Sequence, residues 1–188
     1  MSDTAELLDV IDALVVVLRR HDVPYFITGS FASSVHGEFR ATNDIDIVAK
    51  LDASRLASVL IDLSAAFVTD ADQAQEALSR GAGFNVIHST TYLKVDVFPC
   101  VNAFNSEAMN RAVAIELPGA RERFWVASVE DILLSKLWWF RLEGEVSEVQ
   151  RRDVRRLVEL NRERLDREYL SVWSRVLRVD DLLARVLV

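Results

Sequence analysis

The residues best suited to chemistry are two aspartates, Asp44 and Asp46, in the alternating segment Asp-Ile-Asp-Ile-Val-Ala at 44–49. This alternation predicts a β-strand, in which successive side chains point to opposite faces. Asp44 and Asp46 therefore share one face, while Ile45 and Ile47 point into the core. Two neighbouring carboxylates repel each other, and a divalent cation relieves that repulsion. Because magnesium prefers hard oxygen ligands, the pair predicts a Mg2+ site, which Mn2+ can also occupy.

A third carboxylate, Asp96, lies in an alternating apolar segment at 92–98, which we also expect to be a strand. Lys94 and Asp96 share its polar face. If the two strands are neighbours, three carboxylates converge, as a two-metal phosphoryl transfer requires. In such a transfer one metal lowers the pKa of the attacking hydroxyl and the other neutralises the leaving pyrophosphate. An isolated pair of aspartates more often belongs to a solvated sheet face, so this interpretation depends on the segment upstream.

The upstream segment contains a Gly-Ser turn, Gly29 and Ser30, between an apolar strand at 25–28 and a short helix at 31–37. A helix N-terminus offers unpaired backbone amides and the positive end of the helix dipole, and both bind phosphate. Gly29 lets the backbone come close, and Ser30 adds a hydroxyl donor. A Gly-Ser turn alone is weak evidence, and its combination with the aspartates is what favours a phosphate site.

The combined string is far more specific than its parts. It consists of Gly29, Ser30, Phe31, Ala32, Gly37, Arg40, Thr42, Asp44 and Asp46. Together with Asp96, this string resembles the signature of the DNA polymerase β-like nucleotidyltransferase superfamily over residues 24–98. The 13 residues between Ser30 and Asp44 make the connecting loop slightly longer than in that superfamily.

This resemblance implies a role for each motif residue. Gly29 and Ser30 would hold the β- and γ-phosphates of a nucleoside triphosphate. The metal ligands would be Asp44, Asp46 and Asp96, and Asp96 would also help to activate the acceptor hydroxyl. The nucleotide would be contacted further by Arg40 and Thr42.

Two charged residues interrupt apolar stripes in the second half of the chain. Lys136 falls on the apolar stripe of a predicted helix at 128–142, and Asp153 on that of a predicted helix at 146–160. A lone buried charge is costly, so each residue needs a partner or a function. One interpretation is a structural ion pair that joins the two helices. In the other, Lys136 faces the triphosphate across a cleft, and Asp153 orients it or the acceptor.

The sequence around these two residues favours the second interpretation. The segments Lys-Leu-Trp-Trp at 136–139 and Gln-Arg-Arg-Asp-Val at 150–154 resemble the second motif of the AbiEii-type nucleotidyltransferases. That family includes toxins of bacterial toxin–antitoxin systems. The resemblance implies that Lys136 and Asp153 are active-site residues, with Lys136 at the nucleotide. We expect Trp138 and Trp139 to pack in the core.

Periodicity places these residues in an α+β fold. Helices are predicted at 4–20, 31–37, 53–64, 71–80, 128–142, 146–160, 166–177 and 179–187, and strands at 25–28, 44–49, 84–88, 92–98 and 112–117. We expect a nucleotidyltransferase-type mixed sheet with flanking helices, including a hairpin across Ser89 and Thr90. A C-terminal helical bundle follows. The domains are thus an α/β nucleotidyltransferase domain at 1–120 and a helical domain at 121–188.

The composition is that of a globular cytoplasmic protein. The 188 residues are 51% apolar and 27% charged, which suffices for a core. We expect no membrane span and no secretory signal, because no apolar run is long enough and the N-terminus is acidic. Cys100 is the single cysteine and cannot form an internal disulfide, which fits a reducing cytoplasm. The net charge of -7 argues against a general nucleic-acid binder.

These features predict a metal-dependent nucleotidyltransferase that moves a nucleoside monophosphate from a nucleoside triphosphate, such as ATP, to an acceptor hydroxyl. The AbiEii resemblance implies an RNA acceptor, such as the tRNA 3′ end, or a protein acceptor, and a cognate antitoxin partner. The alternative is a small-molecule transferase of the antibiotic-inactivating type, which has Gly-Gly where this chain has Gly29-Ser30. A decayed binding or antitoxin module is disfavoured, because all three aspartates are retained.

Overall fold

A computed structural model describes residues 2–37 and 44–187, so that Arg40 and Thr42 lie outside the described residues. The helices are α1 (Ser2–Arg20), α2 (Gly29–His36), α3 (Ala53–Leu63), α4 (Ala71–Ser79), α5 (Ala103–Arg111), α6 (Val129–Leu142), α7 (Glu148–Asn161), α8 (Arg167–Val176) and α9 (Asp180–Val186). The strands are β1 (Tyr25–Thr28), β2 (Asp44–Ala49), β3 (Phe67–Val68), β4 (Phe84–His88), β5 (Lys94–Pro99), β6 (Val113–Ile115) and β7 (Phe124–Val126). Within the described ranges, no helix is long and apolar enough to cross a membrane.

The strands form one mixed sheet in the order β3-β4-β5-β2-β1-β7-β6. β2 lies at its centre, antiparallel to β1 and parallel to β5. β7 pairs in parallel with the other side of β1. The fully buried Ile45 and Ile47 fix the register of β2, because a slip by one residue would turn both toward the opposite face. The register that places Asp44 and Asp46 on the other face is therefore fixed by burial.

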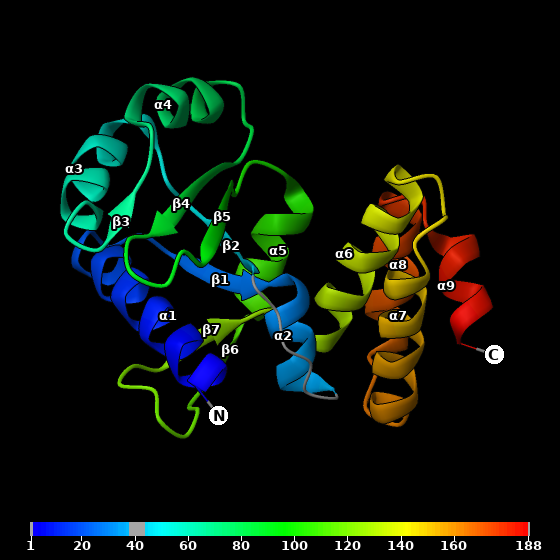
Figure 1. Ribbon diagram of the computed structural model, residues 1–188. Coiled ribbons are helices and arrows are strands. Elements are labelled where there is room, and N and C mark those ends of the chain that lie inside the picture. The colour runs from blue at the N-terminus through cyan, green and yellow to red at the C-terminus, as the bar shows by residue number, and fades with distance from the viewer. Residues whose placement is uncertain (1, 38–43, 188) are drawn as a thin grey trace.

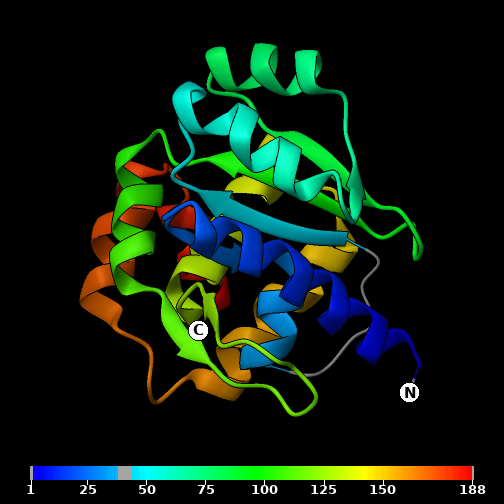
Figure 2. The ribbon, with the colours of Figure 1, turned by 90° about the vertical axis from the view of Figure 1, so that its left-hand side faces the viewer.

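Helices cover both faces of this sheet (Figures 1 and 2). Figure 2 views the face that α1 and α3 cross, and α4 packs beside α3. On the opposite face α2 packs against β1 and β2, and α6 packs on α2. Three C-terminal helices, α7, α8 and α9, gather around α6. This arrangement confirms the predicted α+β class, a mixed sheet with flanking helices followed by a helical bundle.

The helix starts follow from residues that cap the first turn. In α3 to α8 a side-chain oxygen of the capping residue accepts a hydrogen bond from a backbone N–H of that turn. These capping residues are Asp52, Asp70, Asn102, Ser128, Ser147 and Asp166. The start of α2 differs, because its capping residue Thr28 makes no such side-chain bond. The capping residue of α9, Val179, also makes none.

Three elements, β3, α5 and β7, were not predicted from the sequence. β3 and β7 are two and three residues long, too short to show a period. α5 buries only Phe104 and Ala108, so its apolar stripe is weak.

The strand predicted at 92–98 begins at Lys94, because Tyr92 adopts a φ of 60°. The predicted hairpin is confirmed as the antiparallel β4–β5 pair. Since β7 belongs to the sheet, the sheet continues past residue 120, where we expected the first domain to end.

Candidate active site

The three predicted carboxylates come together on two neighbouring strands. β2 and β5 run parallel, and their register pairs Asp46 with Asp96 and Asp44 with Lys94. Because side chains two residues apart share a face, all four lie on the same side of the sheet. Asp44 is exposed at the start of β2, whereas Asp46 and Asp96 are half-buried. The predicted convergence of the three carboxylates required the two strands to be neighbours, and this pairing is present.

A lysine, Lys94, lies within the carboxylate cluster. Its Nζ atom is 2.8 Å from an Asp96 carboxylate oxygen and 4.0 Å from one of Asp44. The hydrogen bond to Asp96 raises the pKa of Lys94. Burial, followed by the charges of Asp96 and Asp44, raises the pKa of Asp46 to about 6. The surroundings of Asp46 therefore disfavour its negative charge.

The superfamily resemblance implies divalent metal ions at this cluster, and the donor set fits them. Three carboxylates on adjacent strands offer the hard oxygen ligands that Mg2+ prefers. The repulsion that contributes to the raised pKa of Asp46 is what a cation relieves. Among residues 2–37 and 44–187, no three His, Cys, Asp or Glu side chains are already grouped to hold a metal ion. In this structure Asp44 and Asp96 face the ammonium group of Lys94.

Gly29 brings the start of α2 directly against Asp46. The helix begins at Gly29 itself, so the predicted Gly-Ser turn is in fact its first turn. Gly29 has a φ of +66°, and a Cβ atom on it would lie 1.9 Å from an Asp46 carboxylate oxygen. Only glycine permits both this backbone conformation and this approach. The positive end of the α2 dipole consequently lies beside the carboxylate cluster, where it favours a phosphate group.

Lys136 and Asp153 form an ion pair between α6 and α7. The Lys136 Nζ atom donates to Asp153 Oδ2 at 3.0 Å and to Gln150 Oε1 at 3.5 Å. Lys136 is buried, and the Asp153 side chain is 14% exposed. Lys136 also lines the cavity that Gly29 and Asp46 line. Burial raises the pKa of Asp46, and the positive charge of Lys136 opposes that rise. The two predicted roles of Lys136, as a structural partner and as a charge facing the site, are therefore compatible.

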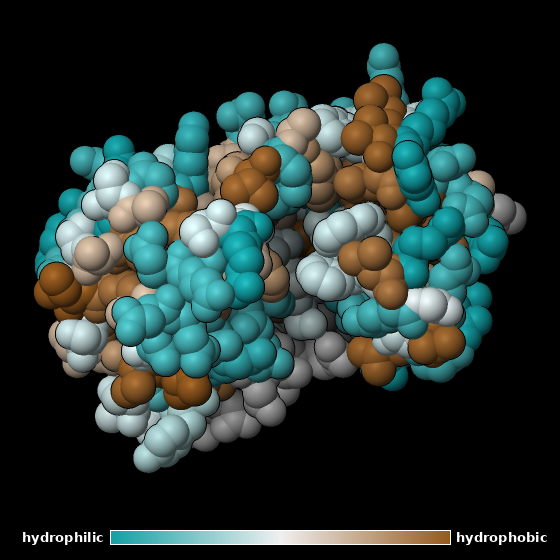
Figure 3. Space-filling view, turned by 90° about the horizontal axis from the view of Figure 1, so that it is seen from above, coloured by the Kyte–Doolittle hydropathy of each residue, from teal (hydrophilic) through white to brown (hydrophobic). Residues whose placement is uncertain are grey.

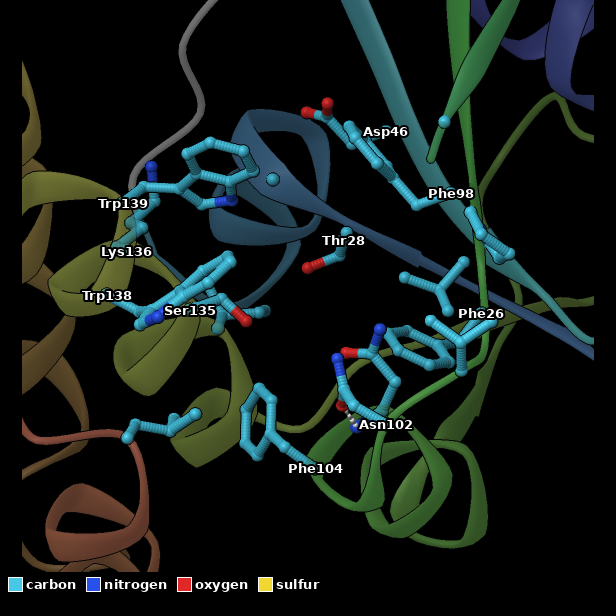
Figure 4. Close-up of a pocket in the computed structure, with 18 of the residues that line it drawn as sticks. Phe26, Thr28, Asp46, Phe98, Asn102, Phe104, Ser135, Lys136, Trp138 and Trp139 are labelled. Carbon is cyan, nitrogen blue, oxygen red and sulfur yellow. Dashed lines mark hydrogen bonds between the residues drawn. The ribbon is translucent and has the colours of Figure 1, made fainter. Parts of the chain in front are cut away.

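A cavity of about 490 Å3 separates the sheet from α6. Seen from above, the surface is hollowed between the sheet side and the helical side of the molecule (Figure 3). Figure 4 shows side chains of α6 facing Thr28 and Asp46 of the sheet across the cavity. The labelled α6 residues are Ser135, Lys136, Trp138 and Trp139. A cavity of this volume, with a few polar groups among apolar ones, is typical of a small-molecule site.

The sequence matches the family described as "Nucleotidyltransferase of unknown function (DUF6036)" over residues 5–177. The chain belongs to this family. Its membership confirms the nucleotidyltransferase assignment made from the Gly-Ser and aspartate motifs, while the AbiEii-type assignment stays a prediction. No curated protein matches the chain.

Solved structures with this fold are also nucleotidyltransferases. An antigenic nucleotidyltransferase-like protein from Paracoccidioides brasiliensis has a TM-score of 0.58 and 16% identity, over 98% of this chain and 93% of that one. The complex of ANT(2'')-Ia with adenylyl-2''-tobramycin has a TM-score of 0.58 and 15% identity, over 92% and 97%. The lincosamide antibiotic adenylyltransferase LnuA, bound to lincomycin, has a TM-score of 0.50 and 17% identity, over 78% and 92%. At these identities the likeness establishes the fold.

Aromatic residues line the cavity of this nucleotidyltransferase, although the sequence did not predict them there. Trp138 and Trp139 are 37% and 43% exposed, so the expectation that they pack in the core is wrong. Phe98 also lines the cavity. Its position was readable from the sequence, because it lies two residues beyond Asp96 and hence on the same face of the strand. The same period placed Lys94 beside Asp96, although no contact with the cluster was predicted for it.

Proposed function

We propose that this protein transfers a nucleoside monophosphate from a nucleoside triphosphate to a hydroxyl group of a small molecule. The observation that carries the proposal is the position of Asp46. It lies in register with Asp96, against the first residue of α2, and in the wall of a cavity of about 490 Å3. The ANT(2'')-Ia complex holds adenylyl-2''-tobramycin, and LnuA is a lincosamide adenylyltransferase. These similarities support a small-molecule acceptor and ATP as the donor.

Each predicted site residue has a role in this proposal. Gly29 and Ser30 hold the β- and γ-phosphates at the start of α2, and Arg40 and Thr42 contribute to nucleotide binding. Lys136 contacts the triphosphate from α6, and Asp153 orients Lys136. Mg2+, or Mn2+ in its place, supplies charge neutralisation and lowers the pKa of the acceptor hydroxyl when bound. The residues that hold the metal are Asp44, Asp46 and Asp96.

The reaction is a displacement at the α-phosphorus. The acceptor oxygen forms a bond to that phosphorus, the bond to the bridging oxygen breaks, and pyrophosphate leaves with the electron pair. Asp96 accepts the hydroxyl proton. Lys136 balances the negative charge that develops on the pyrophosphate, and it needs no rearrangement to do so because Asp153 holds it in place.

Substitution of Asp46 tests this function. We expect Asp46→Asn to abolish transfer of label from ATP labelled at the α-phosphate to a pool of small-molecule alcohols. The fold should survive, because the substitution removes a carboxylate whose charge is disfavoured. Asp72→Asn, at an exposed carboxylate of α4, is the matched control and should retain full transfer. Wild-type transfer by Asp46→Asn would contradict the proposed site.

One feature of α7 favours a second candidate function. This function is the AbiEii-type modification of RNA, with a cognate antitoxin as partner. Its exposed arginines are Arg151, Arg152, Arg155 and Arg156. Two of the four are neutralised within the helix, since Arg151 pairs with Glu148 and Arg156 pairs with Glu159. The same assay with total RNA as acceptor decides between the functions. Labelled RNA without a labelled small molecule would replace the first proposal with this one.

A further inference from the structure

The cavity has an apolar floor directly beside the carboxylates. The sheet register aligns Phe26, Val48 and Phe98 across β1, β2 and β5. All three line the cavity. Asp46 and Asp96 lie two residues earlier on β2 and β5, a separation of roughly 6 to 7 Å along each strand. A ligand resting on Phe98 thus lies within two residues of Asp46, which lines the cavity, and of its register partner Asp96, the group proposed to accept the proton of the acceptor hydroxyl.

Aromatic rings from the helices form an aromatic wall that meets this floor at Phe98. The Trp139 ring lies 6.4 Å from that of Phe98, and the Trp138 ring lies 5.1 Å from that of Trp139. Phe104 of α5 lies below them in Figure 4, and its ring packs 5.6 Å from that of Trp173. Gly83 leaves room for the Phe98 ring, because a Cβ atom there would lie 2.8 Å from Phe98 Cδ1. The partly exposed tryptophans therefore offer their surfaces to a ligand and not to the core.

Charge is scarce in this cavity. Among the described residues that line it, the charged ones are Asp46, Lys136 and Glu143. Asp46 belongs to the carboxylate cluster, and Lys136 is paired with Asp153. Glu143 alone remains to pair with a cationic ligand. Several ammonium groups in such a site would lose water without gaining carboxylate partners, which is costly.

We propose that the acceptor is an uncharged small-molecule alcohol with an aromatic or alicyclic ring, held against the Phe98–Trp139 pair, and not a polycationic amino sugar. This inference rests on the proposed function and names its substrate class. The ring stacks on the aromatic side chains, and the hydroxyl group points toward Asp96. The side-chain amides of Asn102 and Asn105 line the cavity and offer hydrogen bonds to further polar groups of the ligand.

Calorimetric titration of the full chain tests the proposal independently of turnover. The probes are chloramphenicol, an uncharged aryl diol, 3-phenyl-1-propanol, a simpler uncharged alcohol, and tobramycin, a polycation. We expect the uncharged probes to bind more tightly than tobramycin. Phe98→Ala and Trp139→Ala should each weaken their binding by about tenfold and leave ATP binding unchanged. Trp125→Ala is the matched control, since Trp125 is 46% exposed on β7 and lies outside the cavity lining.

Three outcomes would overturn the proposal. In the first, tobramycin binds more tightly than both uncharged probes. In the second, Phe98→Ala and Trp139→Ala both bind the uncharged probes as the wild type does. In the third, these variants lose ATP binding and keep probe binding. The last would show that the aromatic rings hold the nucleobase. Trp139→Ala alters an exposed side chain and keeps the test valid if Phe98→Ala does not fold.

Transfer of label to tobramycin alone would refute this inference and leave the proposed function standing. Probe binding that depends on Phe98, without transfer to any acceptor, would support the site and refute the function.

Discussion

Replacement of Gly29 by alanine measures how closely α2 and Asp46 depend on each other. The residue has a φ of +66°, and holding an alanine in this conformation costs about 1–2 kcal/mol. The new Cβ atom would also lie 1.9 Å from Asp46 Oδ2 and 2.7 Å from Asp46 Cγ. Relief of this overlap requires a shift of the helix or of the carboxylate, which costs about a further 1–3 kcal/mol. We expect Gly29→Ala to lower the free energy of unfolding by about 2–5 kcal/mol in urea titrations.

Gly144 provides a matched control for the backbone term. Its φ is +77°, and nothing lies within 4 Å of a Cβ atom built on it. Gly144→Ala should therefore cost only the backbone term, about 1–2 kcal/mol. The contact with the Asp46 carboxylate is isolated by a double-mutant cycle, because Asp46→Ala removes the two nearest atoms, Oδ2 and Cγ, and leaves Cβ at 3.0 Å. In the Asp46→Ala background, Gly29→Ala should cost less than it does in the wild type and approach the cost of Gly144→Ala.

The same variants give a separate readout of function. Displacement of Asp46 by the Gly29→Ala methyl group should reduce nucleotide transfer strongly, whereas Gly144→Ala should keep it. Equal destabilisation by the two substitutions in the wild-type background would refute the reasoning, because it would mean that the α2 backbone does not rest on Asp46. Full transfer by a folded Gly29→Ala protein would refute the functional part alone.

Three further predictions concern the ion pair, the phosphate site and a half-buried histidine. Lys136→Met should cost about 3–5 kcal/mol in thermal or urea melts, and Lys136→Met/Asp153→Leu should recover most of that stability. The double variant should still lack transfer activity, and recovery of activity together with stability would show that the lysine is purely structural. Ser30→Ala should weaken ATP binding, measured by calorimetry, by about 1–3 kcal/mol with a smaller effect on turnover, and an unchanged affinity would exclude its phosphate contact. Burial lowers the pKa of His36 below its usual 6.5, so its contribution to stability is present above pH 6.5 and is lost as the pH falls toward the lower folded-state pKa. Unfolding between pH 7 and pH 5 should therefore depend less on pH in His36→Gln than in the wild type, and equal pH dependence would contradict this.

The carboxylate cluster shows which information local sequence carries. The period-two pattern at 44–49 was enough to place Asp44 and Asp46 on one face, since Ile45 and Ile47 had to be buried together. Whether Asp96 joined them depended on the parallel pairing of β2 with β5. That pairing connects segments separated by α3, β3, α4 and β4, and no local pattern specifies it. The contact of Lys94 with Asp44 was unpredictable for the same reason.

The positions of Trp138 and Trp139 at the cavity were not predicted for a different reason. The helix that carries them, α6, buries several of its faces. Apolar residues of α6 pack toward α2, α7, α8 and α9, so the helix is apolar around much of its circumference. A tryptophan added to such a pattern looks like one more core residue. However, Trp138 and Trp139 are consecutive and so point about 100° apart around the helix, which one core stripe does not accommodate easily. Both instead border the cavity, where Trp139 meets Phe98 of β5. The consecutive tryptophans were therefore a sequence signal that at least one of them leaves the core, and both border the cavity that Asp46 also lines.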